Sequence, residues 1–544
     1  MSLHSRGEWS ASQVAVRAYH ERTKHHLERY ARSLGYLDWA NQPDPFRRYE
    51  GARVLRLRLP AEEAGPSYDA LFEAPGPPRP LDAEWVSRLF YYSLALSAWK
   101  RIRDRSGRVL ARWSLRVNPS SGNLHPTEAY LVAPPAPGLA QAAAVYHYAP
   151  QIHGLEQLRT LRNWPDTELV LIGLTSIHWR EAWKYGERAF RYSELDLGHA
   201  VGAVALAAAG LGWTARLDDS VSTRSLAALL GIDRQRGIEA ERAGCLLALT
   251  PRGRSPASRC DPATLGGSPW CGEPNRLSPS HHHWPVIDEV EEATESPGLL
   301  HPARPPTGDA LSLGDRRLAA WRLIRQRRSA VAMDATTRIH RDAFFRMLLR
   351  ILPAATPTPF EVLPWRSWLS LLLFVHRVEG LQRGLYALVR DPTHEEGLRR
   401  SLRPDFLWRR PDGCPEPLPL YLLRPGDVRS AARTIACHQE IASDGVFAAA
   451  MLADLEGALA SAGAPMYRRL FWEAGLIGQV LYLEAEAEGI RATGIGCFFD
   501  DALHELAGIR DSSWQSLYQF TLGGALEDPR LETAEAYEHL AGGA

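Results

Sequence analysis

The segment FRYSELDLGHAVGAVALAAAGLG at residues 190–212 has a faint counterpart in YRRLFWEAGLIGQVLYLEAEAEG at residues 467–489. Small and acidic positions of the two segments share one offset of 277 residues: Asp196 with Glu473, Gly198 with Gly475, Leu206 with Leu483 and Gly212 with Gly489. The apolar character of the first segment predicts a long helix, and Gly210-Leu-Gly212 suits a glycine cap at its end. We infer that the chain contains two related halves.

Length, charge and apolar content limit the class of protein. A chain of 544 residues exceeds the roughly 250–300 residues at which single cores stop growing, so more than one domain is expected. Lys plus Arg and Asp plus Glu both number 63, which favours neither nucleic acid nor an anionic membrane as a partner. The longest strongly apolar run, residues 369–375, is shorter than the roughly 20 residues of a membrane span. The N-terminus lacks the apolar core of a secretion signal, so we expect a cytoplasmic protein.

The cysteines and histidines do not form a metal-binding pattern. Six cysteines, at 245, 260, 271, 414, 437 and 497, include no CxxC pair, so we expect reduced thiols rather than a disulfide framework. The run His281-His282-His283 lies in a proline-rich segment without partner ligands, which favours a surface run. The sequence therefore predicts no metal site.

Hydrophobic periodicity predicts the main elements and the domain boundaries. Helices are expected over residues 12–34, 84–99 and 179–209, and buried strands over residues 168–174 and 243–249. Residues 251–310 are rich in Pro, Ser, Gly and Arg, which predicts a partly ordered connector. The Arg47-Arg48 pair could hold a phosphate, but a surface turn is the favoured interpretation. We predict a helical lead-in at 1–80, a first domain at 81–250, the connector at 251–310 and a second domain at 311–544.

The loop Asn118-Pro-Ser-Ser-Gly-Asn-Leu-His-Pro-Thr-Glu128 is the strongest candidate for a binding segment. Two prolines fix φ and Gly122 permits backbone geometries closed to other residues, so the loop has a defined shape. Its hydroxyl and amide side chains can donate and accept hydrogen bonds around a flat heterocycle. Taken by itself, the same pattern also fits an ordinary polar turn.

The sequence PSSGNLHPTE at 119–128, followed by YHY at 146–148 and KYGER at 184–188, resembles the SagB-type (azoline) dehydrogenase branch of the FMN-dependent nitroreductase superfamily. This resemblance implies an α+β fold in which two tandem nitroreductase-like α/β/α domains form a pseudo-dimer within one chain. Members of the superfamily usually form homodimers that bind flavin at the subunit interface. Two fused copies would supply that interface intramolecularly.

The parts of a flavin site are divided between the halves. In the family, each flavin takes its ring-edge loop from one subunit and its phosphate loop from the other. The ring-edge loop occurs only in the first half, since residues 363–368 of the second half have nothing similar. Arg327-Arg328-Ser329 resembles the family's phosphate-binding start, and Gly494-Ile495-Gly496 follows the second repeat. The first half reaches Asp218 five residues sooner than the second reaches Asp500 and has no Gly-Ile-Gly, so we expect one composite FMN site and a degenerate mirror site.

Individual roles follow from the resemblance. The cofactor-binding candidates are Pro119, Ser120, Ser121, Asn123, Arg327, Arg328, Ser329, Gly494, Ile495, Gly496 and Arg530. Lys184 and Tyr185 match a Lys-Tyr pair associated with proton abstraction; the alternative for Lys184 is an exposed charge paired with Glu181 or Glu187. His125 and His147 are expected to serve packing or hydrogen bonding. Val331 replaces a basic residue of the family's pattern, so either the phosphate affinity is lower or Arg530 compensates.

The predicted function is FMN-dependent oxidoreduction by hydride transfer at flavin N5, of the azoline-to-azole type, on a small-molecule or peptidic substrate. Two alternatives are an NAD(P)H-dependent reductase of nitro compounds or quinones, and a flavin-binding scaffold without catalysis. The expected partners are the substrate and, for the reductase alternative, NAD(P)H; neither nucleic acid nor a membrane is expected.

Overall fold

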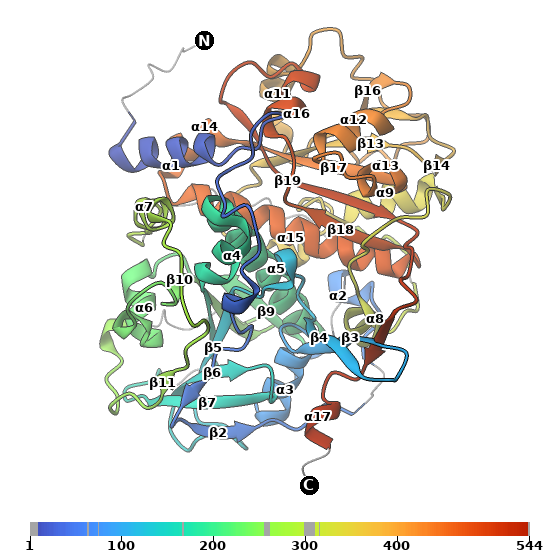
Figure 1. Cartoon of the computed structure of the whole chain (residues 1–544). Helices are drawn as coiled ribbons and strands as arrows, with labels where there is room; N and C mark the ends of the chain where they lie inside the picture. Colours follow the sequence, from blue (N-terminus) through green and yellow to red (C-terminus); the bar gives the residue numbers. More distant parts are fainter. Residues whose placement is uncertain are drawn as a thin grey trace.

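The computed structural model describes residues 9–61, 65–73, 76–165, 168–254, 262–298, 311–314 and 316–541. Each half is built on an antiparallel sheet, and two long helices lie between the sheets (Figure 1). These helices are α5 (Ala189–Gly210) and α15 (Met466–Ala487), in which almost every residue is buried. The molecule therefore has a layered α+β architecture with its largest core at the junction of the two halves.

The two sheets share one strand order. In the first half, strands β7 (Gly154–Thr160), β6 (Ala144–Ala149), β5 (Thr127–Ala133), β8 (Val170–Ser176), β10 (Arg242–Pro251) and β9 (Trp213–Leu217) are neighbours in that order. In the second half the order is β16 (Leu420–Pro425), β15 (Gly384–Leu388), β13 (Leu369–Val375), β17 (Phe447–Asp454), β19 (Trp514–Gly523) and β18 (Arg491–Ile495). All these pairings are antiparallel, and only β2 (Arg53–Arg56), at the edge of the first sheet, has no counterpart. The predicted fold of two related α+β domains is confirmed.

The repeat found in the sequence extends through three helices of each half. The helices α4 (His178–Tyr185), α5 and α6 (Thr223–Leu230) correspond to α14 (Leu455–Ala462), α15 and α16 (Asp500–Ala507), with 455−178, 466−189 and 500−223 all equal to 277. The predicted match of Asp218 with Asp500 is therefore wrong, because Asp500 occupies the position of Thr223. The connecting loops have equal lengths and differ only in composition, so Gly494–Gly496 correspond to residues 217–219.

Two glycines allow the long helices to cross closely. A Cβ atom on Gly198 would lie 2.4 Å from the carbonyl oxygen of Trp472, and one on Gly475 would lie 2.2 Å from that of Leu195. These glycines are themselves one repeat apart, 475−198 being 277. The crossing therefore lies near the pseudo-twofold axis, where each helix presents backbone to the other.

We expect Gly475→Ala to lower the free energy of unfolding by about 1–3 kcal/mol, because the added methyl group overlaps backbone that cannot move aside. Alanine in place of helical glycine otherwise stabilises by about 0.5–1 kcal/mol. The matched control is Gly397→Ala in α11 (Glu395–Ser401), where a Cβ atom would meet nothing within 4 Å. Urea unfolding should show opposite shifts for the two variants. A Gly475→Ala protein as stable as the wild type would refute the close crossing.

The ends of the second half pack on the first half. Strand β20 (Leu531–Ala534) pairs antiparallel with β3 (Leu96–Arg103), which in turn pairs with β4 (Val109–Arg116). Helix α8 (Ala320–Gln326) begins the second half, and its Trp321 stacks on Tyr92 of the first half with ring centroids 4.1 Å apart. Figure 1 shows β20 running back toward the β3–β4 hairpin. Segments at both ends of the second half therefore pack on the first half, in addition to the contact between the two long helices.

Three predicted helices differ from the structure. Helix α1 (Ala11–Arg22) ends well before Leu34, because the following chain pairs with the second half: the backbone N–H of His25 donates to Asp500 Oδ2 at 3.1 Å. Helix α3 (Ala83–Tyr91) ends before the strand β3, so residues 96–99 are not helical. The long helix after Trp179 is interrupted at Gly186 (φ 56°), where the backbone of Arg32 approaches too closely for a side chain.

The structure also places Arg47 and parts of the predicted connector. Arg47 is buried and its guanidinium donates to the carbonyl oxygens of Asn275 and Glu239, so the predicted surface turn is wrong. In the connector, β11 (Glu273–Pro274) pairs with β1 (Tyr49–Glu50), and α7 (Pro285–Ala293) packs against α1. Residues 255–261 and 299–310 of the connector lie outside the described residues.

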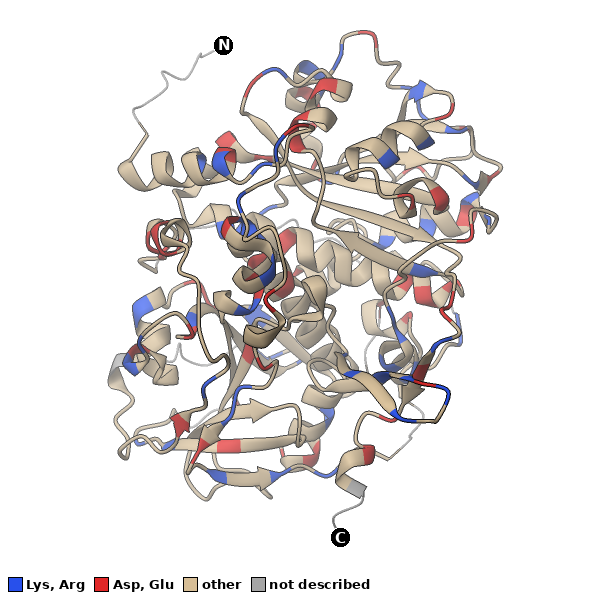
Figure 2. Ribbon diagram, viewed as in Figure 1, with Lys and Arg blue, Asp and Glu red and all other residues tan. Residues whose placement is uncertain are grey.

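Charged residues of both signs are interspersed over both halves (Figure 2). In this view no face carries only one sign of charge, in keeping with the equal totals of basic and acidic residues. Every helix in the described ranges is too short or too polar to cross a bilayer.

Candidate functional site

A cavity of about 670 Å³ lies at the junction of the two halves. The first half contributes the loop 118–125, the β3–β4 hairpin and α5; the second contributes residues 326–331, α15, β18 and the segment before β20. Eleven of the predicted site residues line it: Pro119, Ser120, Ser121, Asn123, Tyr185, Arg327, Arg328, Ser329, Gly494, Ile495 and Gly496. The structure therefore brings together the ring-edge loop and the phosphate-binding start, which are about 200 residues apart in the sequence.

The loop 118–125 is held in shape by its own hydrogen bonds. The Ser121 N–H and hydroxyl both donate to Asp196 Oδ1 at 2.9 Å, and the His125 N–H donates to Ser120 Oγ at 2.8 Å. The Asn123 amide donates to the carbonyl oxygen of Ser114 at 2.9 Å. Asn123 and His125 have positive φ angles, so the loop follows a tightly defined path rather than an ordinary polar turn.

Asp196 is a cavity residue that the sequence-based site prediction omitted. It is 2% exposed, and burial raises the pKa of its carboxyl group to about 7. Its counterpart Glu473 accepts from the Trp368 N–H at 3.1 Å but also pairs with the Arg390 guanidinium. Asp196 thus binds the loop before β5, and Glu473 binds the segment before the equivalent strand β13. Only Glu473 has a cationic partner. Asp196 can consequently take up and release a proton near neutral pH.

This difference predicts a pH-dependent loss of stability. Between about pH 4 and pH 7 the folded protein keeps a proton on Asp196 that the unfolded chain has released, so stability falls as pH rises through this window. The shift from 3.8 to about 7 corresponds to a contribution on the order of 4 kcal/mol. We expect Asp196→Asn, which keeps the hydrogen-bonding shape, to gain stability relative to the wild type as pH rises. Urea unfolding of both flavin-free proteins at pH 4.5 and pH 8 tests this prediction. If the variant and the wild type differ in unfolding free energy by the same amount at both pH values, the prediction is wrong.

Arg327 and Arg328 place buried positive charge at the second-half side of the cavity. Arg327 donates to the carbonyl oxygens of Val117 and Arg116 at 3.1 and 3.2 Å, while its buried Nη1 has no hydrogen-bond partner among the described residues. Burial and the neighbouring Arg327 and Arg325 charges lower the pKa of Arg328 to about 10. In the described part of the chain neither arginine forms an ion pair, and the carboxylate that acts on both, Glu486, is paired with Arg491. Such desolvated, uncompensated guanidinium groups are suited to bind a phosphate.

The Gly494-Ile-Gly496 segment makes room for two tyrosines. A Cβ atom on Gly494 would lie 1.8 Å from the Tyr518 hydroxyl oxygen, and one on Gly496 would lie 1.9 Å from a ring carbon of Tyr192. The Gly494 N–H donates to the Tyr482 hydroxyl at 3.0 Å, which also contacts Ser329 Oγ at 2.9 Å. The glycines therefore allow close packing of aromatic rings around the cavity. No local motif identifies these three tyrosines, because they come from separate helices and strands.

Lys184 and Tyr185 lie in the last turn of α4, beside the loop 118–125. A Cβ atom on Gly122 would be 2.6 Å from the Tyr185 hydroxyl and 3.1 Å from Lys184 Nζ, so both side chains reach the loop backbone. Lys184 is half-buried and is not itself a lining residue. Among the described residues it forms no ion pair, whereas Glu187 pairs with Arg22 at 2.6 Å. The alternative of an exposed, ion-paired Lys184 does not match this placement.

Three further predicted residues occupy different surroundings. Arg530 is exposed and pairs with Asp528 at 2.7 Å, so its guanidinium lies outside the cavity lining, although Asp528 contributes to it. His147 is buried between Glu128 at 3.1 Å and Glu156 at 2.9 Å, as expected of a hydrogen-bonding residue. His125 lines the cavity, and burial lowers the pKa of its imidazole well below the usual value.

The mirror position in the other half carries different side chains. Where the first site has Tyr192 in α5, α15 has Arg469, whose guanidinium stacks 4.9 Å from the ring of the buried Trp365. Ser461 and Ala462 stand where the first site has the Lys-Tyr pair. Packing at this position thus differs from that at the cavity.

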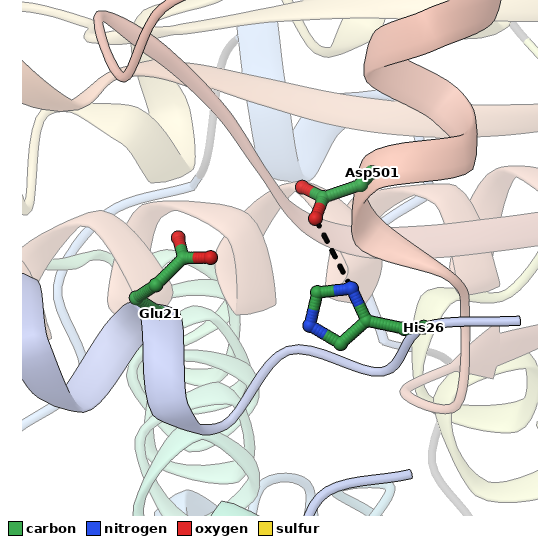
Figure 3. A group of neighbouring side chains, drawn as sticks. All are labelled: Glu21, His26 and Asp501. Carbon is green, nitrogen blue, oxygen red and sulfur yellow. Dashed lines mark ion pairs between the residues drawn. The ribbon is translucent and has the colours of Figure 1, made fainter. Parts of the chain in front are cut away.

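A second group of titratable side chains comprises Glu21, His26 and Asp501 (Figure 3). His26 Nδ1 lies 3.2 Å from Asp501, and one carboxylate oxygen of Glu21 lies within 4.8 Å of both residues. The Lys24 ammonium group pairs with Glu21 at 2.8 Å and with Asp501 at 2.9 Å. The lysine bridges the two carboxylates, so the cluster is an ion-pair network that ties α1 to α16.

Comparisons with known proteins agree with this architecture. The Nitroreductase family model matches residues 101–249 and 422–524. A solved structure described as a nitroreductase from Anabaena variabilis is 23% identical, with a TM-score of 0.65 over 94% of this chain and 99% of that chain. Two further solved structures are more distant. A nitroreductase from Ralstonia eutropha is 17% identical, with a TM-score of 0.28 over 40% of this chain and 95% of that chain. The E. coli microcin synthetase McbBCD complex with truncated pro-MccB17 is 15% identical, with a TM-score of 0.28 over 37% of this chain and 70% of that chain. A search of curated proteins found no significant match. The chain thus has the nitroreductase fold, and the two segments that match the family model lie one in each half.

Proposed function

We propose that the chain is an FMN-dependent oxidoreductase that binds one flavin in the cavity between its halves. The observation that carries the proposal is the unused Nη1 of buried Arg327, beside Arg328, in the same cavity as the shaped loop 118–125. A phosphate would satisfy that donor and neutralise both guanidinium groups. The cavity volume is within the range of small-molecule and cofactor sites, roughly 300–1,000 Å³.

The residues present fit FMN in type and position. Arg327, Arg328 and Ser329 would hold the phosphate, and residues 119–123 with Gly496 would border the ring system. When bound, FMN supplies a two-electron acceptor or donor at its N5 position. The aromatic side chains around the cavity exclude water from the reacting atoms, which strengthens the electrostatic interactions there.

The chain's own residues would manage the proton that accompanies hydride transfer. Lys184 Nζ lies beside the backbone of Gly122 and the Tyr185 hydroxyl, so this pair can accept a proton from a substrate next to the loop. Asp196, with its pKa near 7 and its bonds to Ser121, can take up or release a further proton at the same loop. The motif resemblance at 119–128 and 184–188 supports an azoline ring in a small or peptidic substrate.

The test is the flavin content and redox behaviour of the purified protein. We expect a yellow protein with an oxidised-flavin spectrum and one FMN per chain, retained after gel filtration. Anaerobic addition of an azoline-containing peptide should bleach the flavin and give the azole product. Bleaching by NAD(P)H but not by azolines would instead assign the protein as a reductase, and failure to retain any supplied FMN would refute the flavin site.

A further inference from the structure

Two cysteines from distant segments meet at the edge of the cavity. Cys437 follows α12 (Arg429–Ile435), and Cys497 directly follows Gly496. Their sulfur atoms lie 2.8 Å apart, and Cys497 is a lining residue of the cavity. The sequence-based expectation treated all cysteines as separate reduced thiols, because 60 residues separate these two.

Backbone contacts hold the two cysteines in place. The Gln439 amide donates to the Cys497 carbonyl oxygen at 3.0 Å, and the Phe499 N–H donates to the Ile435 carbonyl oxygen at 2.8 Å. Cys437 has a φ of 52°, a left-handed conformation that is uncommon for a residue with a side chain. Since a disulfide bond measures about 2.05 Å, the sulfurs need to approach by only about 0.8 Å to form one.

The surroundings distinguish the two thiols chemically. The hydrogen bond between the two sulfur atoms, together with the nearby Arg188 guanidinium, lowers the pKa of Cys497. Arg188 is fixed in turn by donating to the Gly496 carbonyl oxygen at 3.2 Å. The sulfur that faces the cavity is therefore the one that carries thiolate character, and the thiolate is the reactive form of cysteine.

We propose that Cys437 and Cys497 form a redox-active pair that takes the electron pair from the flavin of the proposed function, on which this inference rests, after the flavin has oxidised its substrate. In its disulfide form the pair accepts two electrons and one proton from the reduced flavin, which breaks the sulfur–sulfur bond and leaves the Cys497 thiolate and the Cys437 thiol. The Cys497 thiolate then attacks a small disulfide in solution and releases one thiolate, and Cys437 resolves the mixed disulfide, releases the second thiol and restores the 437–497 disulfide. The electron acceptor of the protein would accordingly belong to the disulfide class.

The first experiment examines the couple in flavin-free protein. Treatment with diamide should remove two hydrogen atoms from the intact mass, and peptide mapping should show a 437–497 linkage that reduced dithiothreitol reverses. Cys437→Ser and Cys497→Ser should lose this linkage, whereas Cys414→Ser, a half-buried thiol elsewhere in the second half, should retain it. Absence of the linkage in the wild type would overturn the proposal whether or not FMN binds.

The second experiment follows electron transfer in protein loaded with FMN, whose content is measured before any thiol is added. Under anaerobic conditions, dithiothreitol should drive the proposed step in reverse and bleach the bound flavin at least about tenfold faster in the wild type and in Cys414→Ser than in the two variants of the pair. Equal rates in all four proteins would overturn electron transfer between the cysteine pair and the flavin. A wild type without FMN would refute the flavin site itself, an outcome visible in the first spectrum and separate from the mass analysis.

Discussion

Replacing Lys184 by alanine is expected to lower turnover by about 100- to 10,000-fold, the contribution of a positioned acid–base group, while FMN stays bound. The amine lies beside the loop 118–125 without an ion-pair partner among the described residues, so its loss removes a proton acceptor and leaves the phosphate side intact. The measurement is the turnover number on the azoline substrate, alongside the flavin content of each preparation.

A second variant separates proton transfer from charge. Lys184 is one of only three lysines in the sequence, beside 60 arginines. Arginine keeps the positive charge but does not lose its proton in proteins, so Lys184→Arg should be as inactive as the alanine variant. Lys24→Ala, which disrupts only the ion pairs with Glu21 and Asp501, serves as the matched control. Full turnover in Lys184→Arg would eliminate the proton-accepting role.

Arg328→Ala is expected to raise the dissociation constant of FMN by about 10- to 100-fold, because a hydrogen bond to a charged group contributes about 1.5–3 kcal/mol. The side chain stands among the like charges of other arginines, and the carboxylate that acts on it, Glu486, forms its ion pair with Arg491. The affinity of Arg328 for an anion is therefore only weakly opposed. Titration of flavin-free protein with FMN, followed by fluorescence quenching, measures the change.

Arg530→Ala is the control for that titration. Its guanidinium is exposed and bound to Asp528, so its removal should leave the dissociation constant within about twofold of the wild type. If Arg530→Ala weakened FMN binding and Arg328→Ala did not, the phosphate would have to bind at another wall of the cavity.

The architecture could be predicted because its signals are local and repeated. Gly198 and Gly475 share the offset of their helices, and the glycines are where the two backbones cross. The loop 118–128 was equally recognisable, since its prolines and its glycine are adjacent in the sequence. The domain boundaries and the roles of individual site residues stay predictions.

The remaining features depend on contacts between distant segments. The repeat paired Asp196 with Glu473, but the sequence did not indicate that Asp196 lines the cavity. That position follows from its hydrogen bonds to Ser121, 75 residues earlier. Tyr482 and Tyr518 reach the site from different elements of the second half. The end of α1 at Arg22 likewise results from pairing with Asp500, which local helix propensity cannot reveal.

The fused arrangement of α5 and α15 has a consequence for how the protein can specialise. In a symmetric assembly of identical subunits, each substitution alters both sites at once. Here position 196 holds an uncompensated aspartate and position 473 a glutamate neutralised by Arg390, a divergence that identical subunits cannot reach. The covalent link also makes the meeting of the halves independent of concentration, so dilution does not take the cavity apart.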